Sequence, residues 1–247
     1  MQSAMISVIS EPGQMSPSLE ALLFAVYFAA ATSLSNDEML GLSHAAAKAD
    51  LLNEPNVTSL QALAIFATCL RVHDNSRAVW VLIGTAIRLA QSIGIHRDGV
   101  SLKLDPFESE LRLRLWWQLC LLDSRAPEDH GFANTIENLG HGLRLPLNVD
   151  DAQLYPAMRT LPVESEAWTE TTFCLVQLEA AKLLHQVLGL NARNGPEATC
   201  TLQDIEKQRA EIEKHNQRVE ARFLTLPRAS ATCAASRVPT TTQRVPR

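Results

Sequence analysis

Residues 112–123 read RLRLWWQLCLLD, and this stretch is the most informative part of the sequence. Its charged start and apolar end are typical of a helix that packs into a core. Successive residues of a helix point about 100° apart, so Trp116 and Trp117 must contact different neighbouring surfaces. We therefore predict a helix from Phe107 to Asp123 in which the tryptophan pair has a structural role.

Helical signals recur along the rest of the sequence. Capping residues, apolar spacing and stop residues predict helices at 17–34, 35–52, 58–71, 78–93, 107–123, 166–190 and 202–226. The third and fourth of these helices are separated by a short turn and are expected to be antiparallel. No segment of useful length alternates with the period of a strand. The predicted fold class is therefore all-α, a multi-helix domain with antiparallel helix pairs.

A long stretch between residues 131 and 165 lacks helical periodicity and contains three prolines: Pro146, Pro156 and Pro162. Irregular segments of this length are uncommon in compact domains and often cover a cleft or form a linker. We predict a long irregular loop here. The expected organisation is a flexible leader at 1–16, one domain at 17–226 and a disordered basic tail at 227–247.

Composition excludes several classes of function. The 247 residues carry a net charge of −5, with 46% hydrophobic and 20% charged residues, so binding of nucleic acid through bulk charge is not expected. Residues 207–247 carry +6, and we interpret them as a solvated helix followed by the tail. The apolar run at 21–35 is shorter than the roughly 20 residues that span a bilayer. We therefore expect no membrane partner.

Motifs for catalysis or metal binding are not found. The five cysteines are widely spaced and no two of them form a C-x-x-C pair, so they predict no structural zinc site: Cys69, Cys120, Cys174, Cys200 and Cys233. His96-Arg97-Asp98 imitates a kinase catalytic loop, but the asparagine expected five residues later is Lys103. The sequence thus predicts neither an enzyme nor any catalytic, cofactor-binding or metal-binding residue.

Several segments, in their order and spacing, resemble one family. They are SLEALLFAVY (18–27), SLQAL (59–63), AQSIGIHRDG (90–99), the run from Pro106 through Gly131, RLPLNVDD (144–151) and WTETTFC (168–174). Together they are similar to the regulatory middle region of fungal binuclear zinc-cluster transcription factors, over roughly residues 17–225. The structural signature comprises Arg112, Arg114, Trp116, Trp117, Asp123, Gly131 and Pro146.

The resemblance implies an all-α regulatory domain that works in the nucleus with other transcription regulators or co-regulators. On the tryptophan helix, Glu108–Arg112 and Glu110–Arg114 are (i, i+4) pairs in the favourable orientation. Arg112 and Arg114 are also expected to hold acids such as Asp123 or Asp129. The cysteines of the zinc cluster do not occur in the sequence. Zinc is therefore expected only with a missing N-terminal module, and DNA would be contacted indirectly or through that module.

Three hypotheses remain open. The first is a transcription regulator, with a metabolic gene cluster as a candidate target, that pairs with a relative as a homo- or heterodimer or occupies a co-regulator. The second is a helical scaffold or small-molecule receptor whose pocket lies under the 131–165 loop. The third is a truncated, non-functional fragment of such a factor.

Overall fold

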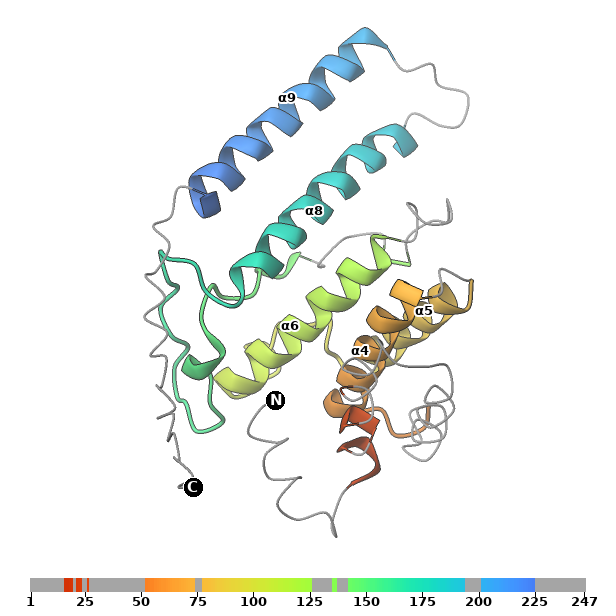
Figure 1. Ribbon diagram of the computed structural model, residues 1–247, viewed down its shortest axis with the longest axis vertical. Coiled ribbons are helices and arrows are strands. Elements are labelled where there is room, and N and C mark those ends of the chain that lie inside the picture. The colour runs from red at the N-terminus through yellow and green to blue at the C-terminus, as the bar shows by residue number, and fades with distance from the viewer. Residues whose placement is uncertain are drawn as a thin grey trace, which may run out of the picture.

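The computed structural model describes residues 16–19, 21–23, 26, 52–73, 77–125, 135–136, 142–193 and 201–224. Every regular element in these ranges is helical, which confirms the all-α prediction (Figure 1). The elements are α4 (Val57–His73), α5 (Arg77–Ser92), α6 (Pro106–Asp123), the 3₁₀ turn η4 (Asp151–Gln153), α8 (Thr172–Arg193), α9 (Leu202–Val219) and the π-helix η5 (Glu220–Leu224).

Helix α6 is the tryptophan helix predicted at 107–123, and it lies between α4 and α5 on one side and α8 on the other (Figure 1). Pro106 occupies the first turn, where a missing N–H costs nothing. Glu108 adds a negative charge near the positive end of the helix dipole. From Leu119 onwards each residue of the helix is buried, so this end of α6 is the centre of the core.

Helices α4 and α5 pack against each other and against α6, and only three residues separate them, as an antiparallel pair requires. Their facing sides supply small and branched side chains to the core: Leu60, Leu63, Ala64, Ala67, Val79, Ile83, Ala86, Ile87 and Ala90. The end of the helix predicted at 78–93 is confirmed, since Gly94 has a backbone φ of 74° and lies in the turn after α5.

Helices α8 and α9 form a second pair of neighbouring helices, seen at the top of Figure 1. The start of α9 is fixed by Thr201 and Asp204, which form a reciprocal capping box. On α9, Ile212 and Val219 face the α8 side chains across a small groove, while Ile205 is half exposed. Of these three apolar side chains, which are spaced by seven residues, two thus pack toward α8.

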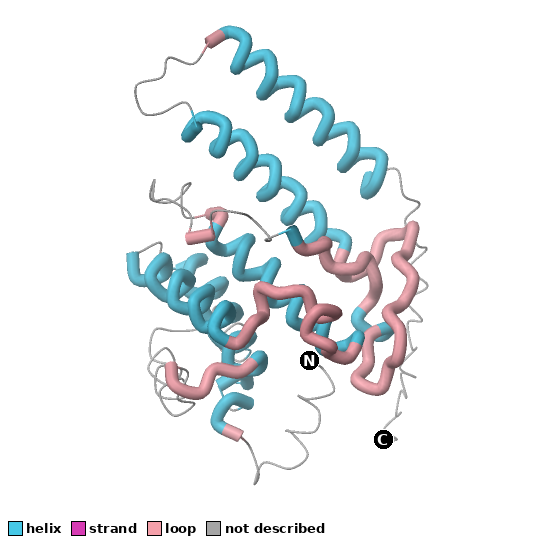
Figure 2. Tube along the Cα trace, turned by 180° about the vertical axis from the view of Figure 1, so that it is seen from behind, coloured by secondary structure: helices cyan, strands magenta, loops and turns pink. Residues whose placement is uncertain are grey.

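An irregular segment, residues 142–171, connects the elements around α6, broken only by η4. It is the long pink tube of Figure 2 and corresponds to the described part of the loop predicted at 131–165. The predicted helix at 166–190 begins six residues late, at Thr172, because side chains of this segment hold 165–171 in a non-helical path, as described below.

Some predictions fall on residues that the structure does not describe. The helix predicted at 35–52 lies outside the described residues except for Leu52, which is in a turn. Gly131 and the tail at 227–247 also lie outside them, as does the leader at 1–16 except for Ser16. The domain boundaries therefore stay predictions. Among the described helices, none combines the length and apolar character needed to cross a membrane.

Candidate functional site

The tryptophan pair joins α6 to two different segments. Trp117 is buried, and its indole Nε1 donates a 2.7 Å hydrogen bond to the carbonyl oxygen of Arg144. The ring of Trp116 is also buried and lies 5.9 Å from the ring of His96, tilted by 55°. Each indole therefore holds a different segment against α6, as the 100° spacing requires.

The arginines of α6 form the two predicted pairs within the helix, with Glu108 and Glu110, but not the predicted pair with Asp123. Arg112 Nε donates to Glu108 at 2.7 Å, one helical turn away. Arg114 is nine residues before Asp123, which is two and a half turns, so the two side chains emerge from opposite faces of α6 and cannot meet. Asp123 instead accepts the backbone N–H groups of residues 135 and 136, at 3.1 and 2.8 Å. Asp129 lies outside the described residues.

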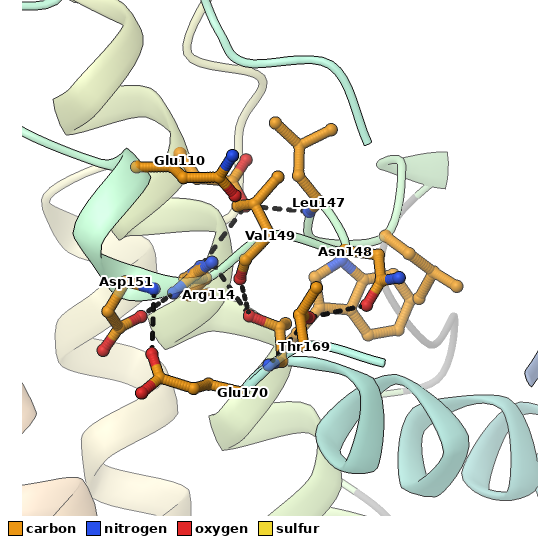
Figure 3. A network of polar contacts seen from close by, with 12 residues as sticks. Glu110, Arg114, Leu147, Asn148, Val149, Asp151, Thr169 and Glu170 are labelled. Carbon is orange, nitrogen blue, oxygen red and sulfur yellow. Dashed lines mark hydrogen bonds and ion pairs between the residues drawn. The ribbon is translucent and has the colours of Figure 1, made fainter. Parts of the chain in front are cut away.

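A fully buried carboxylate, Glu110, joins α6 to the irregular segment (Figure 3). Its Oε1 accepts from Arg114 Nε at 3.4 Å and from the backbone N–H of Leu147 at 2.9 Å. Its Oε2 accepts from Arg144 Nη2 at 2.7 Å. Both oxygens of this carboxylate are thus hydrogen-bonded, as a buried charge requires.

Arg114 extends this network to the molecular surface. Its Nη1 donates to Asp151 Oδ1 at 2.7 Å, and its Nη2 donates to the hydroxyl of Thr171 at 3.0 Å. The backbone N–H of Asp151 in turn donates to Glu170 Oε2 at 3.0 Å, and Figure 3 shows these carboxylates beside the guanidinium. All three nitrogens of Arg114 therefore have partners within the protein.

Asn148 organises the same segment from the other side, and sequence reasoning did not select it. Its Nδ2 donates to the carbonyl oxygens of residues 165 and 167, at 2.8 and 3.1 Å. Its Oδ1 accepts from the hydroxyls of Thr169 and Thr172, both at 2.8 Å. These four bonds use the full capacity of a buried amide and keep 165–171 out of helix. The only sequence signal was a cluster of hydroxyl residues just before α8.

A cavity of about 870 Å³ lies beside this network, between α4, α6 and the irregular segment. Helices α4 and α6 supply most of its wall, and residues 150–156 with Glu170 supply the remainder. The lining residues are Gln61, Ala64, Ile65, Thr68, Cys69, Phe107, Leu111, Arg114, Leu115, Gln118, Asp150, Asp151, Ala152, Leu154, Tyr155, Pro156 and Glu170. Of the predicted signature residues that the structure describes, Arg114 alone lines this cavity.

The other predicted residues have positions in the scaffold. Pro146 is buried in the irregular segment, two residues from Arg144 and next to Leu147, which bind Glu110.

Burial raises the pKa of the Cys69 thiol in the cavity wall. Within the described part of the chain, no group of three or more His, Cys, Asp or Glu side chains is arranged to hold a metal ion.

A second charged cluster lies between α8 and α9. His215 is buried there, and its Nδ1 lies 2.9 Å from Arg218 Nη2. Arg218 also reaches Glu179 on α8 at 3.4 Å. Burial, followed by the positive charge of Arg218, lowers the pKa of His215, whereas the carboxylate of Glu179 acts in the opposite direction. The neutral imidazole is therefore the form that suits this interface.

Comparison with known proteins places this fold in one family. The family model described as "Fungal specific transcription factor domain" matches residues 5–178, a range that contains the cavity and the Glu110 network. No solved structure matches.

Curated proteins that are similar to this chain are also transcription factors. The chain is 30% identical over 241 residues to the aurofusarin cluster transcription factor aurR2 of Gibberella zeae, covering 91% of this chain and 36% of the relative. It is 35% identical over 188 residues to the pyriculol/pyriculariol biosynthesis cluster transcription factor 1 of Pyricularia oryzae, covering 70% and 25%. It is 27% identical over 202 residues to the C6 finger domain transcription factor hasF of Aspergillus fumigatus, covering 72% and 26%.

This chain thus spans about a third or less of the length of these relatives. The family and the relatives are transcription factors rather than enzymes, which agrees with the sequence-based interpretation. The matched range, the helical fold and the relatives lead to one conclusion: the chain belongs to the fungal specific transcription factor domain family.

Proposed function

We propose that this chain regulates transcription in the nucleus, as an interaction domain that controls genes of a secondary-metabolite cluster. The observation that carries the proposal is the match over residues 5–178 to a transcription factor domain. Relatives that are named for the aurofusarin and pyriculol/pyriculariol clusters support the choice of target genes.

We further propose that these 247 residues reach DNA through another protein or through a separate N-terminal module. Their five cysteines are widely spaced and include no C-x-x-C pair, and the net charge of −5 does not favour contact with phosphates. The partner would be a full-length relative, bound as a heterodimer, or a co-regulator. Zinc would belong to the module that contacts DNA.

Deletion of the coding sequence followed by transcript profiling tests the main proposal. Transcripts of neighbouring biosynthetic genes should change, and reintroduction of the wild-type chain should restore them. A Glu110→Ala chain should fail to restore them, because removal of the buried acid takes away the acceptor of Arg114 Nε and of the backbone N–H of Leu147 and leaves a cavity in its place. Unchanged transcripts in the deletion strain would contradict regulation of these genes.

Mapping the transcript from its first exon tests how DNA is reached. A coding sequence upstream of Met1 that contains a six-cysteine cluster would show a module on the same protein. A start at Met1 would require a partner, which should co-precipitate with the chain from nuclear extract.

The cavity favours a second function, the binding of a small molecule. Cavities of roughly 300–1,000 Å³ accommodate drug-sized ligands, and the cavity of about 870 Å³ lies in that range. A ligand at about 100 times its dissociation constant should stabilise the fold by about 2.7 kcal/mol. A flat thermal-shift response across a metabolite panel would contradict this function.

A further inference from the structure

The cavity between α4, α6 and residues 150–156 has an apolar floor and a charged edge. Helix α4 contributes Ala64 and Ile65 to the floor, and α6 contributes Phe107, Leu111 and Leu115. A floor of this kind binds apolar surface, because water displaced from it returns to bulk. The ligand that fits must therefore have a largely apolar body.

The edge selects the polar group of such a ligand. Three of the lining side chains are carboxylates, Asp150, Asp151 and Glu170, and one is the guanidinium of Arg114. If all four are ionised, the lining carries a net charge of −2 at neutral pH.

The single positive charge in the lining is already engaged. Each nitrogen of Arg114 donates to a protein oxygen, including Glu110 and Asp151. These bonds use three of the five N–H donors of the guanidinium, and its charge is already paired with the carboxylates of Glu110 and Asp151. With a net charge of −2 in the lining, an anionic group is disfavoured by charge.

The carboxylates, in contrast, keep accepting capacity for a ligand. Asp151 uses Oδ1 for Arg114, and Glu170 uses Oε2 for the backbone N–H of residue 151. An ionised carboxylate has about four acceptor sites, so each of these groups can accept further hydrogen bonds. Both belong to the irregular segment, which forms one side of the cavity. Figure 3 shows the two carboxylates near each other and near Arg114.

We infer that this cavity binds a mainly apolar small molecule that carries a cationic amine, with the amine held by Asp151 and Glu170. The inference rests on the ligand-binding function proposed above and adds the chemical class of the ligand. Recognition combines burial of the apolar body against α4 and α6 with ion pairing at the edge. Anionic molecules with the same body are rejected.

The test uses three fluorescent probes with one apolar body and different polar groups: 1-pyrenemethylamine, 1-pyrenemethanol and 1-pyrenecarboxylate. Fluorescence anisotropy with the full chain should show the amine binding at least 10-fold more tightly than the carboxylate, with the alcohol between them. Added salt should narrow the difference, because ion pairs at an open edge are screened.

Two matched tryptophan variants locate the binding site. Thr68 is exposed on α4 and lines the cavity, whereas Thr85 on α5 lies outside the lining; each hydroxyl bonds the carbonyl four residues earlier. Thr68→Trp should weaken all three probes at least 10-fold, and Thr85→Trp should leave them unchanged. Ala152→Trp blocks the cavity from the opposite wall if Thr68→Trp does not fold.

The double variant Asp151→Asn, Glu170→Gln tests the charge at the edge. Asparagine and glutamine oxygens can still accept from Arg114 and from the backbone, so the local hydrogen bonds remain possible. The preference for the amine over the alcohol should disappear, while the affinity for the alcohol stays the same.

The possible outcomes separate the inference from the function on which it rests. If the carboxylate probe binds as tightly as the amine and Thr68→Trp blocks both, the cavity binds ligands but the proposed class is wrong. If no probe binds, or if Thr68→Trp and Ala152→Trp leave binding intact, the ligand-binding function itself is overturned.

Discussion

The buried carboxylate of Glu110 provides the most direct test of how this domain is held together. In Glu110→Gln the side chain keeps its shape, and its oxygen can still accept from Arg114 and from the backbone of Leu147. The new NH₂ group then points at Arg144, which is a donor rather than an acceptor. The substitution thus removes one charge-assisted hydrogen bond and creates an unpaired buried donor.

The size of the effect follows from these two changes. A hydrogen bond to a charged group contributes about 1.5–3 kcal/mol, and an unsatisfied buried donor costs about 1–3 kcal/mol. Arg144 is 42% exposed and can hydrogen-bond to water instead, so the loss of its bond to Glu110 leaves no unsatisfied charge on Arg144. We expect the free energy of unfolding to fall by about 3 kcal/mol, and Tm by roughly 6–12 °C for a chain of this size.

Glu108→Gln is the matched control, since it makes the same chemical change one half-turn earlier on α6. The Glu108–Arg112 pair is partly exposed, with the two side chains 34% and 22% accessible, so its loss should cost about 0.3 kcal/mol. Thermal and urea unfolding followed by circular dichroism would measure both variants. Equal stability losses in the two variants would refute the role assigned to the buried network. A wild-type chain that melts without cooperativity would instead favour the truncated-fragment hypothesis.

Three further predictions concern the tryptophans, His215 and the thiols. Trp117→Phe removes a buried indole donor and should lower the free energy of unfolding in urea by about 2 kcal/mol. Trp168→Phe, at a half-exposed position, should lower it by less than about 1 kcal/mol. Similar losses in the two variants would contradict the larger role assigned to Trp117. Because the pKa of His215 is lowered on folding, the unfolded chain binds more protons, so stability should decline as pH falls through about 6.5; a His215→Gln chain with an unchanged pH profile would count against this. Burial raises the pKa of Cys69 and Cys174, so iodoacetamide should alkylate both thiols far more slowly than in the denatured chain, as measured by peptide mass spectrometry. Bound 1-pyrenemethylamine should slow the alkylation of Cys69 further but not that of Cys174, because only Cys69 lines the cavity. Equal alkylation rates in the folded and denatured chains would exclude protection of the thiols by burial.

The parts of the fold that local signals control were predictable from the sequence. Helix α6 begins at Pro106 and α5 ends before Gly94, as proline and glycine at such positions indicate. The start of α8 was not predictable, because Asn148 holds the preceding turn from 24 residues away. The spacing of apolar residues within 166–172 gives no indication of that contact.

The site was predictable in place but not in detail. A pocket under the 131–165 loop was one of the hypotheses, and the cavity does lie beside residues 150–156. Of the partners of Arg114, Glu110 was predicted from its spacing of four residues, but Asp151 was not, since it is 37 residues distant and nothing in a single sequence links the two. Long-range pairs of this kind depend on how the irregular segment packs on α6. That segment has no periodic pattern from which its packing could be predicted.

Two residues of the irregular segment that are close together in the sequence make contacts with different parts of the domain. Glu170 lines the cavity, and Trp168, only two residues earlier, donates its indole N–H to the carbonyl of Phe223 just beyond α9. Helix α9 has 18 residues and is therefore about 27 Å long. A tilt of about 5° at the Phe223 end would carry the opposite end by about 2 Å over that length. Leu202 and Ile205, which are exposed at the far end of α9, would move furthest in such a tilt, and the short stretch 168–170 joins the cavity wall to the end about which the helix would turn.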